Sequence, residues 1–116
     1  MKIDLSDRTA VITGGSRGLG EAMAKSLSEA GAKVALVARD LQRLEKVRSD
    51  IVDAGGNAEV FVADVTREEE VARMAEAVTQ RFGHAQILIN SAGTNIRKNL
   101  VDFSLEEFRK IGRAHV

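Results

Sequence analysis

Apolar and polar positions along the chain follow two regular patterns that alternate. Short runs of consecutive apolar residues predict buried strands at 9–13, 33–38, 58–63 and 86–90. Between and after these runs, apolar residues recur every three or four positions, which predicts amphipathic helices. The apolar faces of the four predicted helices are Leu19/Met23/Leu27/Ala30, Leu41/Leu44/Val47/Ile51, Val71/Ala75/Val78/Phe82 and Leu105/Phe108/Ile111.

Residues that commonly begin and end helices flank these segments. Thr66 with Glu69, and Ser104 with Glu107, have the spacing of a capping box, in which each side chain bonds the other residue's backbone N–H. Glycines that favour helix termination follow three of the helices: Gly31, Gly55 with Gly56, and Gly83. The predicted order is therefore strand then helix, four times over.

Continuous apolar strands separated by helices indicate a parallel sheet that is covered on both faces. Right-handed crossovers between the strands leave few topologies. The predicted fold is α/β: a Rossmann-like, doubly wound parallel sheet with strand order 3-2-1-4, truncated after the fourth strand and the start of the fourth helix. We find no linker or repeat, so residues 1–110 are predicted to form the N-terminal part of one domain.

Composition excludes several classes of function. The 116 residues carry a formal net charge of +0, which disfavours nucleic acid and anionic membranes as partners. Cys is absent and the two histidines, His84 and His115, are far apart, so no metal site is expected. Asp4 and Asp7 precede a short apolar run, which is unlike a signal peptide, and no run reaches the roughly 20 apolar residues of a membrane helix. We expect a cytoplasmic protein.

The segment TGGSRGLG joins the first strand to the first helix and carries four glycines, of which Gly14, Gly18 and Gly20 form the motif. Gly14 permits a tight exit from the strand, Gly18 permits close approach of a ligand, and Gly20 permits close packing of helix on sheet. The free N–H groups of the helix N-terminus attract anions, and pyrophosphate is their usual occupant in this context. An ordinary strand-to-helix turn is the alternative. The other predicted cofactor-binding residues of this turn are Ser16, Arg17 and Leu19.

With TGGSRGLG, ADV and NSAG in this order, the chain resembles the classical short-chain dehydrogenase/reductase family over residues 6–111. The glycine spacing is G-x-x-x-G-x-G. The resemblance implies an NAD(P)-dependent oxidoreductase that transfers hydride on a carbonyl/alcohol pair. It also implies a small-molecule carbonyl or alcohol substrate for the full-length protein, and a parent that is a homo-oligomer.

Arg39 follows the second strand, where a doubly wound fold places the adenosine ribose. An acid there binds the free 2′-hydroxyl of NAD, whereas Arg39 with Arg17 suits the 2′-phosphate of NADP. We therefore predict NADP as the cofactor, with NAD as the alternative. Asp40 complicates this prediction, because its carboxylate can approach the hydroxyl instead. In the competing interpretation Arg39 is a solvated residue that precedes Asp40 as a helix N-cap.

Two further motifs complete the predicted cofactor site. By resemblance, the Asp64 side chain and the Val65 backbone bracket the adenine; Asp64 can also cap the following helix. The motif NSAG ends the fourth strand at the point where the strand order reverses. Asn90 is expected to tie the central sheet together by hydrogen bonding, while Ala92 and Gly93 leave room for the cofactor ribose. Ser91 replaces the Asn that is usual in the family.

The sequence contains no Tyr. In the family, a Tyr in a Tyr-x-x-x-Lys helix exchanges the proton, a Ser orients the substrate and an Asn supports a proton relay; the resemblance places all of them beyond the region this sequence reaches. No catalytic residue is assigned. Two other interpretations stay open: a non-catalytic dinucleotide-binding module, and a fragment without activity.

The last six residues, IGRAHV, do not continue the apolar periodicity of the helix before them. The DNA string ATCGGAAGAGCACACGTC, the start of a common sequencing adapter, translates to the same six residues. Our hypothesis is that residues 111–116 are not native, with a cloning scar or a divergent terminus as the alternative. A genomic reading frame that continues these codons would count against it.

A sheet that stops after its fourth strand leaves that strand as an apolar edge without the helices that should cover it. We therefore expect the isolated 116-residue polypeptide to be unstable or to aggregate. Size-exclusion chromatography and thermal denaturation test this expectation. A monodisperse monomer with a sharp cooperative melt would refute it.

Overall fold

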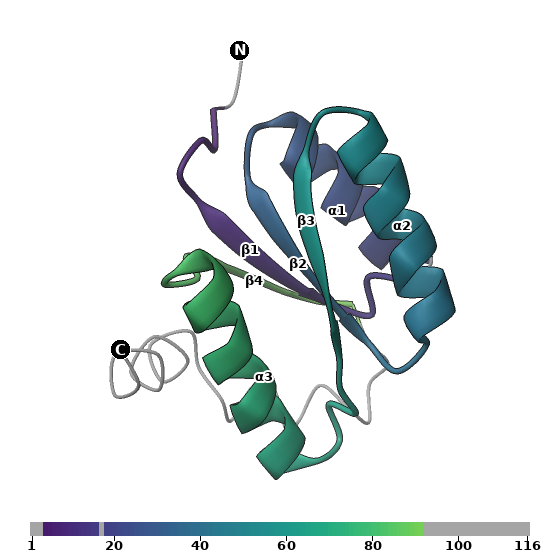
Figure 1. The fold of residues 1–116 in the computed structure, drawn as a ribbon, viewed down its shortest axis with the longest axis vertical. Helices are drawn as coiled ribbons and strands as arrows, with labels where there is room; N and C mark the ends of the chain where they lie inside the picture. The colour runs from purple at the N-terminus through teal and green to yellow at the C-terminus, as the bar shows by residue number, and fades with distance from the viewer. Residues whose placement is uncertain (1–3, 17, 92–116) are drawn as a thin grey trace.

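The computed structural model describes residues 4–16 and 18–91, which form a parallel sheet between helices (Figure 1). Strands and helices alternate along the chain: β1 (Thr9–Thr13), α1 (Gly18–Glu29), β2 (Lys33–Ala38), α2 (Leu41–Asp53), β3 (Asn57–Val62), α3 (Glu68–Phe82) and β4 (Ile87–Asn90). The strand order is β3-β2-β1-β4 and all three pairings are parallel. The predicted fold class and strand order are confirmed.

Two apolar clusters lie on opposite faces of the sheet. On one face, buried side chains of α1 and α2 pack on alternate residues of the strands, including Ile12 and Leu36. On the other face, α3 packs on the intervening residues, including Val11 and Val37. Figure 1 shows the same arrangement, with α1 and α2 on one side of the sheet and α3 on the other. Both faces of the central strands are thus covered, as their continuous apolar sequence predicted.

Burial decreases from the centre of the sheet toward β4. All five residues of β1 are buried, whereas all four residues of β4 are only partly buried.

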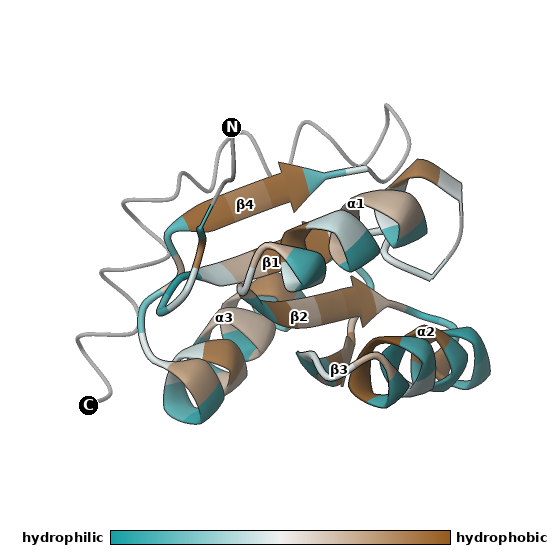
Figure 2. Cartoon of the chain, turned by 90° about the horizontal axis from the view of Figure 1, so that it is seen from above, coloured by the Kyte–Doolittle hydropathy of each residue, from teal (hydrophilic) through white to brown (hydrophobic). Residues whose placement is uncertain are grey.

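Hydrophobic residues run along β2 and β4, while the outer side of α2 is hydrophilic (Figure 2). The helices therefore present polar faces outward and their apolar faces to the sheet.

The predicted apolar faces of α1 and α2 are wrong at their first positions. Leu19 is 70% exposed and Leu41 is 49% exposed. Each lies in the first turn of its helix, beyond the area that the sheet covers, at the carboxyl ends of the strands. In α2 the buried residues are Leu44, Val47 and Ile51, as predicted. The boundaries of the third and fourth strands each differ from the prediction by one residue.

The capping box predicted from Thr66 and Glu69 does not form. Helix α3 begins at Glu68, and its N-cap residue, Arg67, makes no side-chain capping bond. The Thr66 hydroxyl instead donates to the Asp64 carboxylate, so it is not directed at the helix. The Glu70 carboxylate reaches back and accepts from the Asp64 backbone N–H. The Thr66 N–H, which the capping box would direct to Glu69, also donates to the Asp64 carboxylate.

Several expectations fall outside the part of the chain that the structure describes. These are the positions of Arg17, Ala92 and Gly93, the final helix with its Ser104–Glu107 cap, and the tail at 111–116. In the described part, no helix is both long enough and apolar enough to cross a bilayer.

Candidate functional site

The carboxyl ends of β1, β2 and β3 surround a pocket of about 110 Å³. Because the strands are parallel, their ends and the loops that follow them meet at one edge of the sheet (Figure 1). The pocket brings together four residues that the sequence analysis selected from three separate motifs: Gly14, Arg39, Asp64 and Val65. Val37, Ala38 and Ala63 complete its lining. This edge is therefore the candidate ligand site.

The turn after β1 has the backbone geometry that its glycines predicted. Gly14 has φ 72° and donates its N–H to the Val37 carbonyl at 2.8 Å, which ties the turn to β2. Gly18 has φ 59° and starts α1, and a Cβ there would meet no heavy atom within 4 Å. Since space is free on that side, Gly18 is needed for its conformation and leaves the backbone open to a ligand.

Gly20 is required for close packing and not for its backbone angles. A Cβ at this position would overlap the Gly14 carbonyl oxygen and the Ser91 hydroxyl, and would lie 2.8 Å from the Gly14 carbonyl carbon. No side chain larger than hydrogen fits there unless the backbone moves. The absent side chain thus fixes the first turn of α1 against the turn after β1 and the end of β4.

The two sides of the pocket carry opposite charges. Arg39 is exposed and its positive charge acts on Asp64 across the pocket. Asp40, the residue that complicated the prediction at Arg39, is the N-cap of α2, where its carboxylate accepts from the Arg43 N–H at 3.2 Å. Asp40 therefore caps the helix, as the competing interpretation of Arg39 predicted, while Arg39 lines the pocket.

Asp64 is held as a carboxylate. It accepts from the Thr66 hydroxyl at 2.5 Å and from the Thr66 N–H at 3.0 Å. These bonds, with smaller contributions from the charges of Arg39 and Arg67, hold the pKa of Asp64 below its ordinary value of 3.8. Because the pKa is lowered on folding, ionised Asp64 stabilises the fold above pH 3.8, and this contribution is lost as the pH falls through the lower, folded value.

Hydrogen bonds at the end of β4 tie this strand to β1. The Thr13 hydroxyl donates to the Asn90 side-chain oxygen at 3.0 Å, as the sequence analysis expected of Asn90. Ser91 adds a connection that was not predicted, because its hydroxyl and its N–H both donate to the Thr13 carbonyl, at 2.5 and 3.1 Å. In the sequence, the signal for this role was the position of Ser91 directly after the fourth strand. Its contact with Gly20 is seen in the structure.

The remaining predicted site residues have unequal outcomes. Ser16 is buried in the turn, while Leu19 projects outward from the start of α1. Arg17, Ala92 and Gly93 lie outside the described residues, so their predicted roles stay predictions. Within the described ranges, no group of three His, Cys, Asp or Glu side chains could hold a metal ion.

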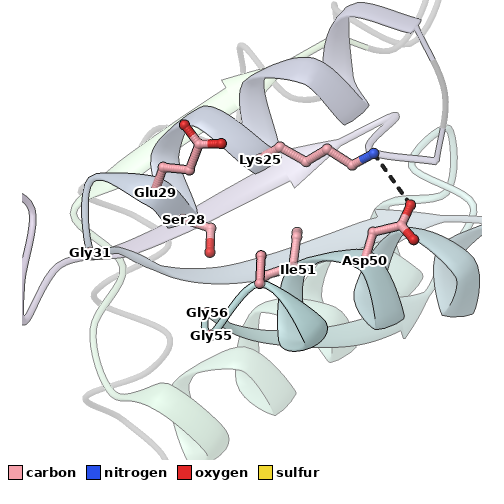
Figure 3. Close-up of a pocket in the computed structure, with 9 residues that line it drawn as sticks. Lys25, Ser28, Glu29, Gly31, Asp50, Ile51, Gly55 and Gly56 are labelled. Carbon is pink, nitrogen blue, oxygen red and sulfur yellow. Dashed lines mark hydrogen bonds and ion pairs between the residues drawn. The ribbon is translucent and has the colours of Figure 1, made fainter.

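A larger pocket, of about 550 Å³, lies between the C-terminal ends of α1 and α2 (Figure 3). Lys25 reaches across from α1 toward Asp50 of α2, at 3.3 Å, and also pairs with Glu21 at 2.8 Å. None of the predicted site residues lines this pocket. It lies at the end of the helices farthest from the glycine turn, and its lining carries one cation, Lys25, and two acids, Glu29 and Asp50.

The contact at Gly20 generates a stability prediction. We expect Gly20→Val to lower the free energy of unfolding by roughly 1–3 kcal/mol or more, since the turn or β4 must move to admit the side chain. Ala22→Val on the exposed side of the same helix is the matched control, with an expected cost of less than about 1 kcal/mol. Urea denaturation of protein expressed from the complete reading frame measures both. Equal effects of the two substitutions would contradict the packing role of Gly20.

Comparison with known proteins agrees with this geometry. An uncharacterised oxidoreductase of Staphylococcus epidermidis is 38% identical over 104 residues, which cover 90% of this chain and 44% of that protein. A metagenomic short-chain oxidoreductase solved in complex with NADP has 42% identity and a TM-score of 0.75, over 78% of this chain and 41% of that one. L-sorbose reductase from Gluconobacter frateurii, solved with NADPH and L-sorbose, has 38% identity and a TM-score of 0.77, over 81% of this chain and 36% of that one.

This chain spans less than half the length of each of these three proteins. A family model described as short chain dehydrogenase matches residues 8–114. The match includes all the motifs at the carboxyl edge of the sheet, from the glycine turn to the end of β4. With the parallel sheet, the strand order and the glycine turn in place, the chain belongs to the short-chain dehydrogenase family.

Proposed function

We propose that this chain is the cofactor-binding part of an NADP(H)-preferring oxidoreductase that transfers hydride on a carbonyl/alcohol pair. The observation that carries the proposal is the pocket at the carboxyl edge of the sheet, which gathers Gly14, Arg39, Asp64 and Val65. A dinucleotide lies along this edge in doubly wound folds, with its pyrophosphate at the first helix and its adenosine at the second and third strands. Residues 1–110 would form this part.

The glycine turn fits a bound diphosphate. Gly20 has no room for a Cβ, and Gly18 leaves open space at the start of α1. The free N–H groups of the first turn of α1 would then face the ligand, and their partial positive charge would stabilise a diphosphate. When bound, NADPH supplies the hydride; the residues described here bind and orient it.

The preference for NADP over NAD rests on Arg39. Arg39 is exposed beside the pocket. None of the ion pairs between described residues involves it. Asp40 is engaged as the N-cap of α2, which argues against its binding a ribose hydroxyl. A charge-assisted hydrogen bond contributes about 1.5–3 kcal/mol, which corresponds to roughly tenfold or more in affinity.

The related structures support the same cofactor, since the metagenomic oxidoreductase was solved with NADP and L-sorbose reductase with NADPH. The sequence has no Tyr, so no proton-transfer residue is assigned among its 116 residues, and the chain is expected to be inactive alone. A small carbonyl or alcohol as substrate, a homo-oligomeric parent and a cytoplasmic location are further parts of the proposal.

Titration with reduced cofactors tests this function. We expect protein expressed from the complete reading frame to bind NADPH at least about tenfold more tightly than NADH, because only NADPH carries the phosphate that Arg39 would bind. Arg39→Ala should remove most of this difference and leave NADH binding unchanged. Arg73→Ala, at an exposed position of α3 that does not line this pocket, is the control. Binding of neither cofactor would overturn the proposal.

A tighter affinity for NADH than for NADPH would contradict the NADP preference alone. Binding of both cofactors without turnover of any carbonyl or alcohol would instead favour a non-catalytic dinucleotide-binding module.

A further inference from the structure

A second pocket lies beside the glycine turn, between α1 and α2 at their N-terminal ends. It has a volume of about 150 Å³ and is lined by Ser16, Glu21, Gln42, Arg43, Lys46 and Val47. This volume is several times the roughly 30 Å³ that one water molecule takes up in the liquid, so a hydrated phosphate group fits. Ser16 lies two residues after Gly14, and Arg43 four residues after Arg39, so the same two segments line both pockets.

The described residues that line this pocket carry a net positive charge. Arg43 and Lys46 are both exposed, and neither takes part in an ion pair with another described residue. Among the described residues of the lining Glu21 is the single acid, and it shares Lys25, at 2.8 Å, with Asp50. The two cations of this lining thus outnumber its one acid among the described residues, which favours an anion there.

The packing of α2 fixes Arg43 in this position. Leu44, Val47 and Ile51 are buried against the sheet, and this sets the rotation of the helix about its axis. The Asp40 cap holds the Arg43 backbone N–H at the first turn. Positions 42, 43 and 46 are consequently exposed on the side of the helix that borders the glycine turn. The backbone that carries the two cations is thus held in place before any ligand binds.

We propose that Arg43, assisted by Lys46, is a second specificity-determining residue. It binds the phosphate of the adenosine ribose from the α2 side, while Arg39 binds the same phosphate from the pocket at the carboxyl ends of β1, β2 and β3. This inference rests on the proposed function, since it names further residues for the same cofactor. The new element is that part of the NADP selectivity lies inside helix α2, at residues that follow the strand–helix loop.

Matched substitutions test this assignment in protein expressed from the complete reading frame. Arg43→Ala should weaken NADPH binding about tenfold, the loss of one charge-assisted bond, and leave NADH binding within about twofold. Lys46→Ala should give a smaller loss of the same selectivity. Arg43→Lys should retain part of the affinity, because it keeps the charge without the paired N–H groups. Arg73→Ala on α3 should change neither affinity.

A gain of affinity provides a test that misfolding cannot imitate. Glu21→Gln removes the one acid among the described lining residues and one of the two acids that pair with Lys25, so it should tighten NADPH binding and leave NADH binding unchanged. The probes adenosine 2′,5′-bisphosphate and adenosine 5′-monophosphate separate the phosphate contribution from the rest of the cofactor. We expect Arg43→Ala to weaken only the bisphosphate.

The outcomes separate the two proposals. If the unsubstituted protein prefers NADPH and Arg43→Ala keeps that preference, the role of Arg43 is overturned and the proposed function stands. Equal weakening of NADPH and NADH by Arg43→Ala would also overturn it, because that pattern indicates a structural effect. If the unsubstituted protein binds neither cofactor, both proposals fail.

Discussion

The close approach of helix α1 to the turn after β1 at Gly20 is the contact on which the rest of the site depends. A hydrogen atom in place of a side chain lets α1 contact the Gly14 carbonyl and the Ser91 hydroxyl. This contact joins the turn after β1, the start of α1 and the end of β4 at one point. The helix N-terminus is therefore held at the edge of the sheet where the strand order reverses, and its free N–H groups are available for an anion.

Electrostatics at this edge follow from the same geometry. Parallel strands bring Arg39 and Asp64, distant in sequence, to one pocket. Local hydrogen bonds then determine which of the charged groups at this edge are available to a ligand. Hydrogen bonds from Thr66 lower the pKa of Asp64, and Asp40 is occupied at the start of α2. Arg39 remains as the charge that a ligand would meet, and Arg43 extends the positive surface along the helix.

The periodicity of the sequence predicted the layers and most of the buried residues, because burial on both faces leaves a continuous apolar run in each strand. The strand order followed from right-handed crossovers and the doubly wound topology. It failed where packing stops, at Leu19 and Leu41, since spacing alone does not show where the sheet ends. The capping box at Thr66 does not form because the Thr66 N–H donates to the nearby Asp64 carboxylate and the helix begins one residue later than predicted.

The glycine turn, Arg39, Asp64 and Asn90 could be selected from motifs, whereas Ser91 and Arg43 required the structure. Arg43 in sequence looks like any exposed helical cation, and only the rotation of α2 places it beside Ser16.

The most direct test of the account is the mapping of backbone amide chemical shifts by NMR during titration with NADPH. We predict that the largest chemical-shift changes arise at residues 14–20, 39–43 and 64–65, around the two pockets beside the glycine turn. Shifts confined to the pocket between the C-terminal ends of α1 and α2, around Ser28 and Gly55, or no shifts at all, would contradict it.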